Sequence, residues 1–175
     1  MLSKSFDVLT PLSKLHRISR SILNRTNFTS EPGLWIALAN NGVQGYVDGA
    51  VVEVGNADAS TVYELCLNYS QPADVINATG IGAYESNDTK VGRITTISES
   101  GVRLYVGDGL INPDTSIGGL AIGDKLVVSA DGDSHDGKIR KATAPGDYVA
   151  VVKVTGIDGN SIEVQTIEPA TITVT

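Results

Sequence analysis

The residue types that could do chemistry are concentrated in one acidic stretch, residues 131–137, which reads Asp-Gly-Asp-Ser-His-Asp-Gly. Serine, histidine and aspartate are the members of a hydrolytic triad, but a working triad brings them together from separate parts of a fold. The aspartates are also typical of a calcium loop, yet their spacing departs from the usual pattern and Ala142 occupies the twelfth position. We interpret Asp131, Asp133, His135 and Asp136 as a solvated hairpin tip, with a weak ion site that includes Asp124 as the alternative.

The other reactive groups form no catalytic pattern either. Cys66 lies between Leu65 and Leu67 without an activating neighbour, so we expect it to be a small buried apolar side chain. The glycine pairs at 80–82 and 118–119 lack the third glycine of a dinucleotide fingerprint, and no phosphate-binding loop is present. We therefore expect no enzymatic activity, no cofactor and no bound metal. An enzyme whose site is built from scattered aspartates is the alternative.

The elements that would position these groups are short strands. The 175 residues include 19 glycines, only 5% aromatic residues and 19% charged residues. After Leu34 the apolar residues alternate with a period of two, and turn residues recur every eight to twelve positions. This pattern predicts a mainly β domain over residues 31–175, built as a β-barrel or a β-sandwich. Ser98 to Gly101 predicts a hairpin turn, and a break near 107–120 would divide the domain in two.

The composition also bears on the setting of the protein. The chain has one cysteine, which cannot form an intramolecular disulfide. The sequence contains no run of eighteen apolar residues, so it predicts no membrane span. No nucleic-acid-binding motif is visible, so we expect neither nucleic acid nor membrane as a partner.

The first thirty residues differ from the rest of the chain and are predicted to be a separate N-terminal arm. They carry five basic residues against one acidic residue, a net charge of +4, whereas the remainder carries eight against nineteen, a net charge of −11. Thr10-Pro11 is a good helix start, and Leu12, Leu15, Ile18 and Ile22 follow at spacings of three and four. These features predict a short amphipathic helix over about 10–24.

A stripe of this kind must be buried against the body of the chain, a partner protein or a membrane surface. We favour a docking arm for an acidic partner surface. The arm is also similar in composition to a mitochondrial presequence, which is an alternative. Trp35 is a candidate interface anchor, although core packing is the interpretation that we favour for its apolar run. The predicted interface residues are Leu12, Leu15, Arg17, Ile18, Arg20, Ile22, Arg25 and Trp35.

One segment of the sequence resembles a known family. Residues 119–132 read Gly-Leu-Ala-Ile-Gly-Asp-Lys-Leu-Val-Val-Ser-Ala-Asp-Gly, followed by Gly-Lys-Ile-Arg-Lys-Ala at 137–142 and Tyr-Val-Ala-Val-Val at 148–152. A Gly-Asp turn, an apolar strand, a Ser-x-Asp-Gly turn and a short basic strand occur in this order in phage head decoration proteins. The resemblance covers about 118–155, and the insertion at His135 departs from it.

This resemblance implies a β-tulip-like domain that acts as a capsid cement protein. Such a protein binds the major capsid protein on the outer surface of the virion, as a homotrimer that clamps neighbouring capsomers, and assembles in the host cytoplasm. The alternative is a phage tail or fibre module that binds a receptor or a glycan.

Overall fold

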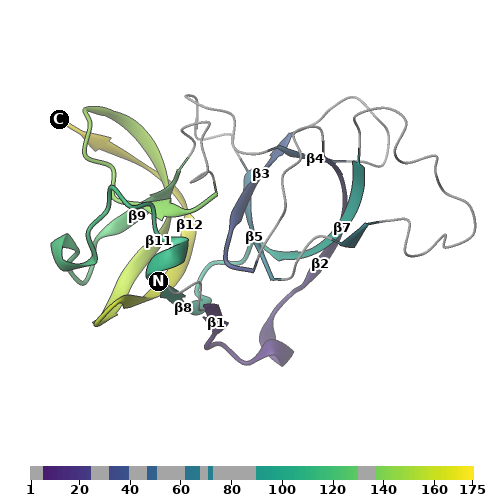
Figure 1. Ribbon diagram of the computed structural model, residues 1–175, viewed down its shortest axis with the longest axis horizontal. Helices are drawn as coiled ribbons and strands as arrows, with labels where there is room; N and C mark the ends of the chain where they lie inside the picture. The colour runs from purple at the N-terminus through teal and green to yellow at the C-terminus, as the bar shows by residue number, and fades with distance from the viewer. Residues whose placement is uncertain are drawn as a thin grey trace, which may run out of the picture.

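The protein is mainly β, as the sequence predicts, and its described strands form two sheets of six strands each (Figure 1). The computed structural model describes residues 6–24, 32–39, 47–50, 62–67, 71–72, 90–129 and 137–175. The first sheet is antiparallel and has the strand order β1 (Phe6–Val8), β8 (Arg103–Gly107), β12 (Ser161–Val174), β11 (Gly146–Asp158), β9 (Lys125–Val128) and β10 (Ile139–Arg140).

The second sheet is built from the strands nearer the N-terminus. Its order is β2 (Ile18–Asn24), β4 (Val47–Ala50), β3 (Trp35–Ala39), β5 (Val62–Cys66), β7 (Lys90–Ile97) and β6 (Gln71–Pro72). β2 pairs in parallel with β4 and also antiparallel with β7. No closed barrel is found among the described strands.

The helix predicted over 10–24 is wrong. Residues 12–14 form one 3-10 turn, η1 (Leu12–Lys14), and residues 18–24 form β2, which pairs with β7 over seven residues. The apolar positions at 18 and 22 are four apart, a spacing that places both side chains on one face of a strand as well as on one face of a helix. Strand pairing outweighs helix propensity here because isolated helices of this length are marginal in water.

The predicted hairpin at Ser98–Gly101 is also wrong, because this turn links two sheets. β7 precedes the turn and lies in the second sheet, whereas β8 follows it and lies in the first sheet. The tight turn at Gly159 and Asn160 does close a hairpin, and it joins the two longest strands, β11 and β12. Two further 3-10 turns, η3 (Asp108–Leu110) and η4 (Ile117–Gly119), lie between β8 and β9.

One hydrophobic core is shared by the two sheets. Leu104 pairs with Val164, and Val106 pairs with Ile162, so alternate positions of β8 and β12 turn buried apolar side chains to one face. These side chains belong to the same buried cluster as residues of the second sheet. The contributing residues of the second sheet and the turns around it are Leu34, Trp35, Tyr63, Leu65 and Ile97.

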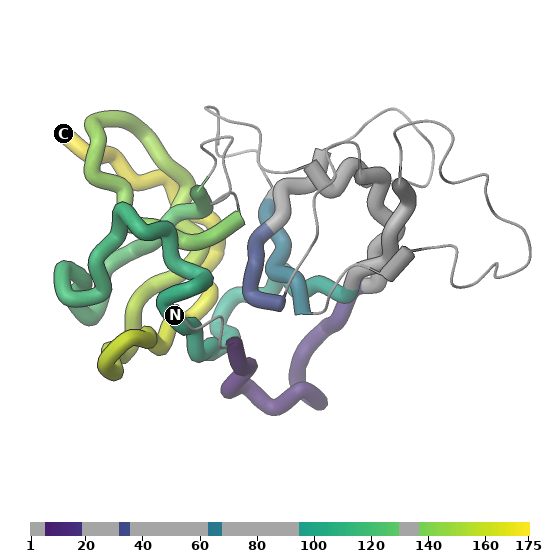
Figure 2. Tube along the Cα trace, in the orientation of Figure 1, coloured from purple at the N-terminus to yellow at the C-terminus, as the bar shows by residue number. Residues whose placement is uncertain are grey.

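Backbone contacts join the sheets where the core is shared. The amide of Trp35 in β3 donates to the carbonyl of Gly137, just before β10, at 2.8 Å. Gly137 has φ +83°, and a Cβ at this position would lie 2.8 Å from the carbonyl oxygen of Trp35. Any larger residue would therefore push the two sheets apart. Figure 2 shows the chain after β1 running from the first sheet to the second.

We predict that Gly137→Ala destabilises the protein by about 2 kcal/mol or more, because the methyl group adds both backbone strain and a collision with a backbone oxygen. Urea unfolding followed by fluorescence of Trp35 measures the change. Gly119→Ala is the matched control, since no atom lies within 4 Å of its added Cβ, and its effect should stay within about 0.5 kcal/mol. Equal effects for the two variants would contradict the tight contact.

Candidate functional site

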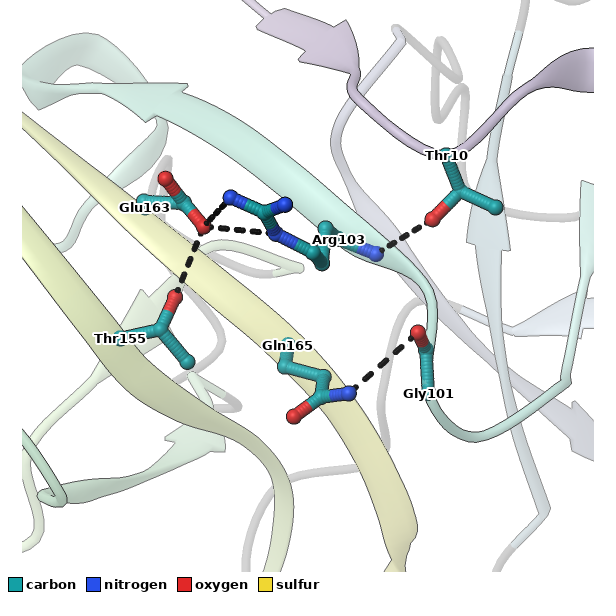
Figure 3. A network of polar contacts seen from close by, with 6 residues as sticks. All are labelled: Thr10, Gly101, Arg103, Thr155, Glu163 and Gln165. Carbon is teal, nitrogen blue, oxygen red and sulfur yellow. Dashed lines mark hydrogen bonds and ion pairs between the residues drawn. The ribbon is translucent and has the colours of Figure 1, made fainter.

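The N-terminal connection, residues 9–17, joins β1 of the first sheet to β2 of the second. Hydrogen bonds hold it at both ends. The amide of Leu9 donates to the carbonyl of Arg103 at 2.9 Å, and the amide of Arg103 donates to the Thr10 hydroxyl at 2.9 Å (Figure 3). At the other end, the amide of His16 donates to Oε1 of Glu99 at 2.6 Å. The connection is therefore tied to the turn between the sheets and to the strand that follows it.

The N-terminal connection presents apolar and basic side chains to solvent. Leu12 is 55% exposed and Leu9 is 41% exposed, although large apolar side chains usually lie inside a protein. Lys14 and Arg17 are also exposed, whereas Leu15 is partly buried and packs against the shared core. The result is a fixed surface with two leucines and two cations, anchored from beneath by Leu15.

The predicted interface residues are not gathered on one helical face. Leu12, Leu15 and Arg17 lie in the N-terminal connection, and Ile18 is a partly buried residue at the start of β2. Trp35 is 6% exposed and belongs to the shared core, so its side chain is not a surface anchor in this structure.

The rest of the predicted arm is only partly described. Arg20 and Ile22 are in β2, where the structure describes the backbone, and Arg25 lies outside the described residues. Residues 6–8 and 18–24 are strands paired with later parts of the chain. Removing residues 1–30 would therefore take one strand from each sheet, and point variants are the better test of docking.

A polar network on the face of the first sheet opposite the core supports the connection from below (Figure 3). Nε of Arg103 donates to Oε1 of Glu163 at 2.8 Å, and the Thr155 hydroxyl donates to the same oxygen at 3.3 Å. Nε2 of Gln165 donates to the carbonyl of Gly101 at 3.4 Å. The side chain of Arg103 is 58% exposed, so its ion pair contributes little stability and mainly orients side chains.

Cys66 is an inert thiol, as the sequence predicts. Its side chain is fully buried, and desolvation together with the nearby carboxylate of Glu64 raises the pKa of Cys66 to about 12. A nucleophilic cysteine needs the opposite shift. Glu64 is buried as well and accepts a hydrogen bond of 2.5 Å from the Thr96 hydroxyl, a contact between β5 and β7.

Asp124 already has protein partners at one oxygen of its carboxylate, Oδ2. It accepts a hydrogen bond from Nζ of Lys141 at 2.7 Å and from the amide of Ala121 at 2.9 Å. The bond from Lys141 is the main reason that the pKa of Asp124 is lowered. The other residues of the suggested ion site, at 131–136, lie outside the described residues. Within the described ranges, no three His, Cys, Asp or Glu side chains come together as a metal site would require.

A polar hollow of about 360 Å³ is the feature that sequence reasoning missed. It lies between η3, η4 and the turn that joins β11 to β12, and Asp108, Ser116 and Asn160 line it. Asn112 at its base is 1% exposed and donates from Nδ2 to the Ser129 hydroxyl at 2.8 Å, which fixes the loop. The turn residues Asn112-Pro113-Asp114 and Gly118-Gly119 were the available signal, but they do not show that separate loops converge.

Comparison with known proteins supplies no relative: no family model, curated protein or solved structure matches the chain. Among the residues that the structure describes, no helix is both long enough and apolar enough to cross a membrane.

We predict that Cys66 resists alkylation in the folded protein and reacts readily after unfolding, because the buried thiol stays protonated. Treatment with iodoacetamide at pH 8 to 9, followed by mass spectrometry with and without urea, measures this. Equal labelling of the folded and unfolded chains would contradict the burial of the thiol.

The same thiol predicts a pH dependence of stability. In the unfolded chain Cys66 ionises near its ordinary pKa of 9.0, whereas in the folded chain it stays protonated until about pH 12. The unfolded state therefore binds fewer protons in this window, and the free energy of unfolding falls as the pH rises through it. Cys66→Ala should remove this part of the slope in urea titrations between pH 8 and 11. An unchanged slope would contradict the prediction.

Proposed function

We propose that this protein is a non-enzymatic structural protein of a virion, a capsid cement protein that binds the outer surface of the major capsid protein shell. The observation that carries the proposal is the N-terminal connection, which has two exposed leucines and two exposed cations within nine residues and is hydrogen-bonded at both ends. The resemblance of residues 118–155 to head decoration proteins names the partner. The absence of a metal cluster among the described residues is compatible with this role and does not establish it.

Each part of the connection has a physical task in docking. Leu9 and Leu12 lose water when a partner covers them, and this burial drives association. Lys14 and Arg17 attract an acidic surface and set the orientation, a contribution that salt weakens. Because the backbone is already fixed by hydrogen bonds to Arg103 and Glu99, little conformational entropy is lost on binding.

The finer architecture belongs to the same proposal. In the second sheet, β2, β4, β3, β5 and β7 pair in this order, and β7 also pairs with β2. We infer that these five strands form a small barrel when the protein is bound to the capsid. The first sheet would then be the tulip-like part that the resemblance implies, since it contains residues 118–155. A homotrimer on the capsid surface follows from the resemblance alone.

A second candidate function is a tail or fibre module that binds a glycan. The polar hollow lined by Asp108, Ser116 and Asn160 favours it, because carboxylate, hydroxyl and amide groups are suitable partners for sugar hydroxyls. The hollow has no aromatic lining residue, however, and aromatic platforms are expected in sugar sites. Binding of the chain to glycans, without binding to capsid shells, would favour this candidate.

We predict that Leu9→Asp combined with Leu12→Asp weakens binding to undecorated capsid shells at least about tenfold, because two apolar contacts are lost and two charges meet an acidic surface. Co-sedimentation of the full chain with undecorated shells assembled from a phage major capsid protein measures occupancy. Ile122→Asp is the matched control, since Ile122 is a 71% exposed apolar residue in a different part of the molecule.

The cations allow an independent check of the same surface. Lys14→Glu with Arg17→Glu should weaken binding most at low salt, and raised salt should weaken wild-type binding only in part. Wild-type occupancy for both double variants, with folding confirmed by circular dichroism, would exclude the N-terminal connection as the docking surface.

A further inference from the structure

The outer part of β12 has one side that no other described strand pairs. β12 pairs with β11 from Ser161 to Val174, with an irregularity between Thr166 and Ala170. On its other side it pairs with β8 only from Ser161 to Gln165, and the last backbone bonds there join Thr166 to Gly101 and Val102. Beyond Thr166, therefore, the described part of the chain leaves the backbone of this edge without a neighbouring strand. An open edge is a template for pairing with another strand.

The sequence of this edge suits pairing. Residues 171–175 read Thr-Ile-Thr-Val-Thr, so every residue is β-branched and none is charged, in a chain with a net charge of −7. Natural edges that must stay single usually carry charges, proline or bulges. Between Thr166 and Ala170 the same edge does carry such features, namely Glu168, Pro169 and a register shift, so the part suited to pairing is confined to residues 171–175.

The two faces of residues 171–175 differ in burial, and a neighbouring strand would cover more of the apolar face. Thr171 and Thr173 are exposed, whereas Ile172 and Val174 are partly buried against a small second cluster that includes Tyr148 and Ala150. Ile172 lies directly opposite Tyr148 of β11. A further strand that placed apolar residues beside Ile172 and Val174 would extend this cluster and exclude water from it.

We propose that this edge pairs with the same edge of a second copy of the chain, antiparallel and about a two-fold axis at Thr173. In this register Thr173 lies opposite Thr173, Ile172 opposite Val174 and Thr171 opposite Thr175, so all five pairs are β-branched and the faces match. Cross-strand pairs of this kind are favourable, and no like charges meet. This two-fold register pairs all five residues with one another, whereas a shift of the axis in either direction pairs fewer of them. This contact does not rest on the proposed function, and its two-fold symmetry differs from the trimer that the resemblance implies.

A contact of five residue pairs is smaller than the roughly 1,000 Å² of buried surface that stable interfaces exceed. The dimer is therefore weak, and it forms as the protein concentration rises. Sedimentation of the full wild-type chain over a wide range of concentrations should show a monomer that converts to a dimer. A monomer at every concentration, or a trimer, would overturn the proposal.

Disulfide trapping tests the register. Opposed residues of antiparallel strands have Cα atoms about 4.5–5.5 Å apart, within disulfide range. Thr173→Cys should therefore form a covalent dimer at least about tenfold faster than Thr171→Cys, whose two copies would lie about 13 Å apart along the strands. An equal mixture of Thr171→Cys and Thr175→Cys should cross-link at about half the rate of Thr173→Cys, because about half of its dimers contain one chain of each variant, and faster than either variant alone. Cys66 is fully buried, so the native thiol does not compete.

A collision control is Thr155→Cys, on a strand that is already paired on both sides near this position. Circular dichroism and thermal melting of each variant check that the chain is folded. If the Thr173→Cys chain cross-links no faster than the Thr155→Cys chain, the edge does not pair with a second copy and the proposal is wrong.

Discussion

The shared hydrophobic core between the two sheets is the constraint on which the rest of the structure depends. Leu65 and Ile97 from the second sheet and Leu104 and Ile162 from the first are almost completely excluded from water. Burying such side chains contributes about 1.5–3 kcal/mol each before ordering costs, which is more than any single polar contact supplies. The two sheets therefore fold as one packed unit, and the turn at Ser98–Gly101 has to carry the chain from one to the other.

The N-terminal connection follows from this packing. Once β1 is paired with β8 in the first sheet and β2 with β7 in the second, the nine residues between them must cross the junction on the outside. Leu9 and Leu12 of this crossing segment lie outside the shared core, and their side chains stay in solvent. Exposure of apolar side chains here is thus a consequence of topology, and the proposed docking role makes use of it.

Much of the fold could be predicted from the sequence, because alternation and turn residues are local signals. The tight turn before Ser161, the burial of Cys66 and the mainly β class are all confirmed. The helix over 10–24 could not be excluded, since Ile18 and Ile22 share a face in either conformation and only the distant strand β7 decides between them. The hairpin at Ser98–Gly101 failed for the same reason: a turn motif does not show which strands pair across it.

The candidate surface was predicted in part. The exposed Leu12 and Arg17 belong to the surface that the sequence indicated. Core packing was already the favoured interpretation of the apolar run around Trp35, and the burial of its side chain confirms it. Leu9 was missed because it precedes the predicted helix start at Thr10-Pro11. Its exposure depends on the pairing of Val8 with Leu104, which is 96 positions away in the chain and has no local signature.

The long separation between β1 and β8 has a consequence for biosynthesis. β1 leaves the ribosome almost a hundred residues before the strand with which it pairs, and β8 in turn needs β12, which follows the other described strands in the chain. Contacts between residues this distant in sequence slow folding. Until they form, strand edges and apolar side chains stay exposed to solvent. The first sheet can therefore be completed only after synthesis has reached Val174, the last residue of β12, and until then β1 has no complete sheet to join.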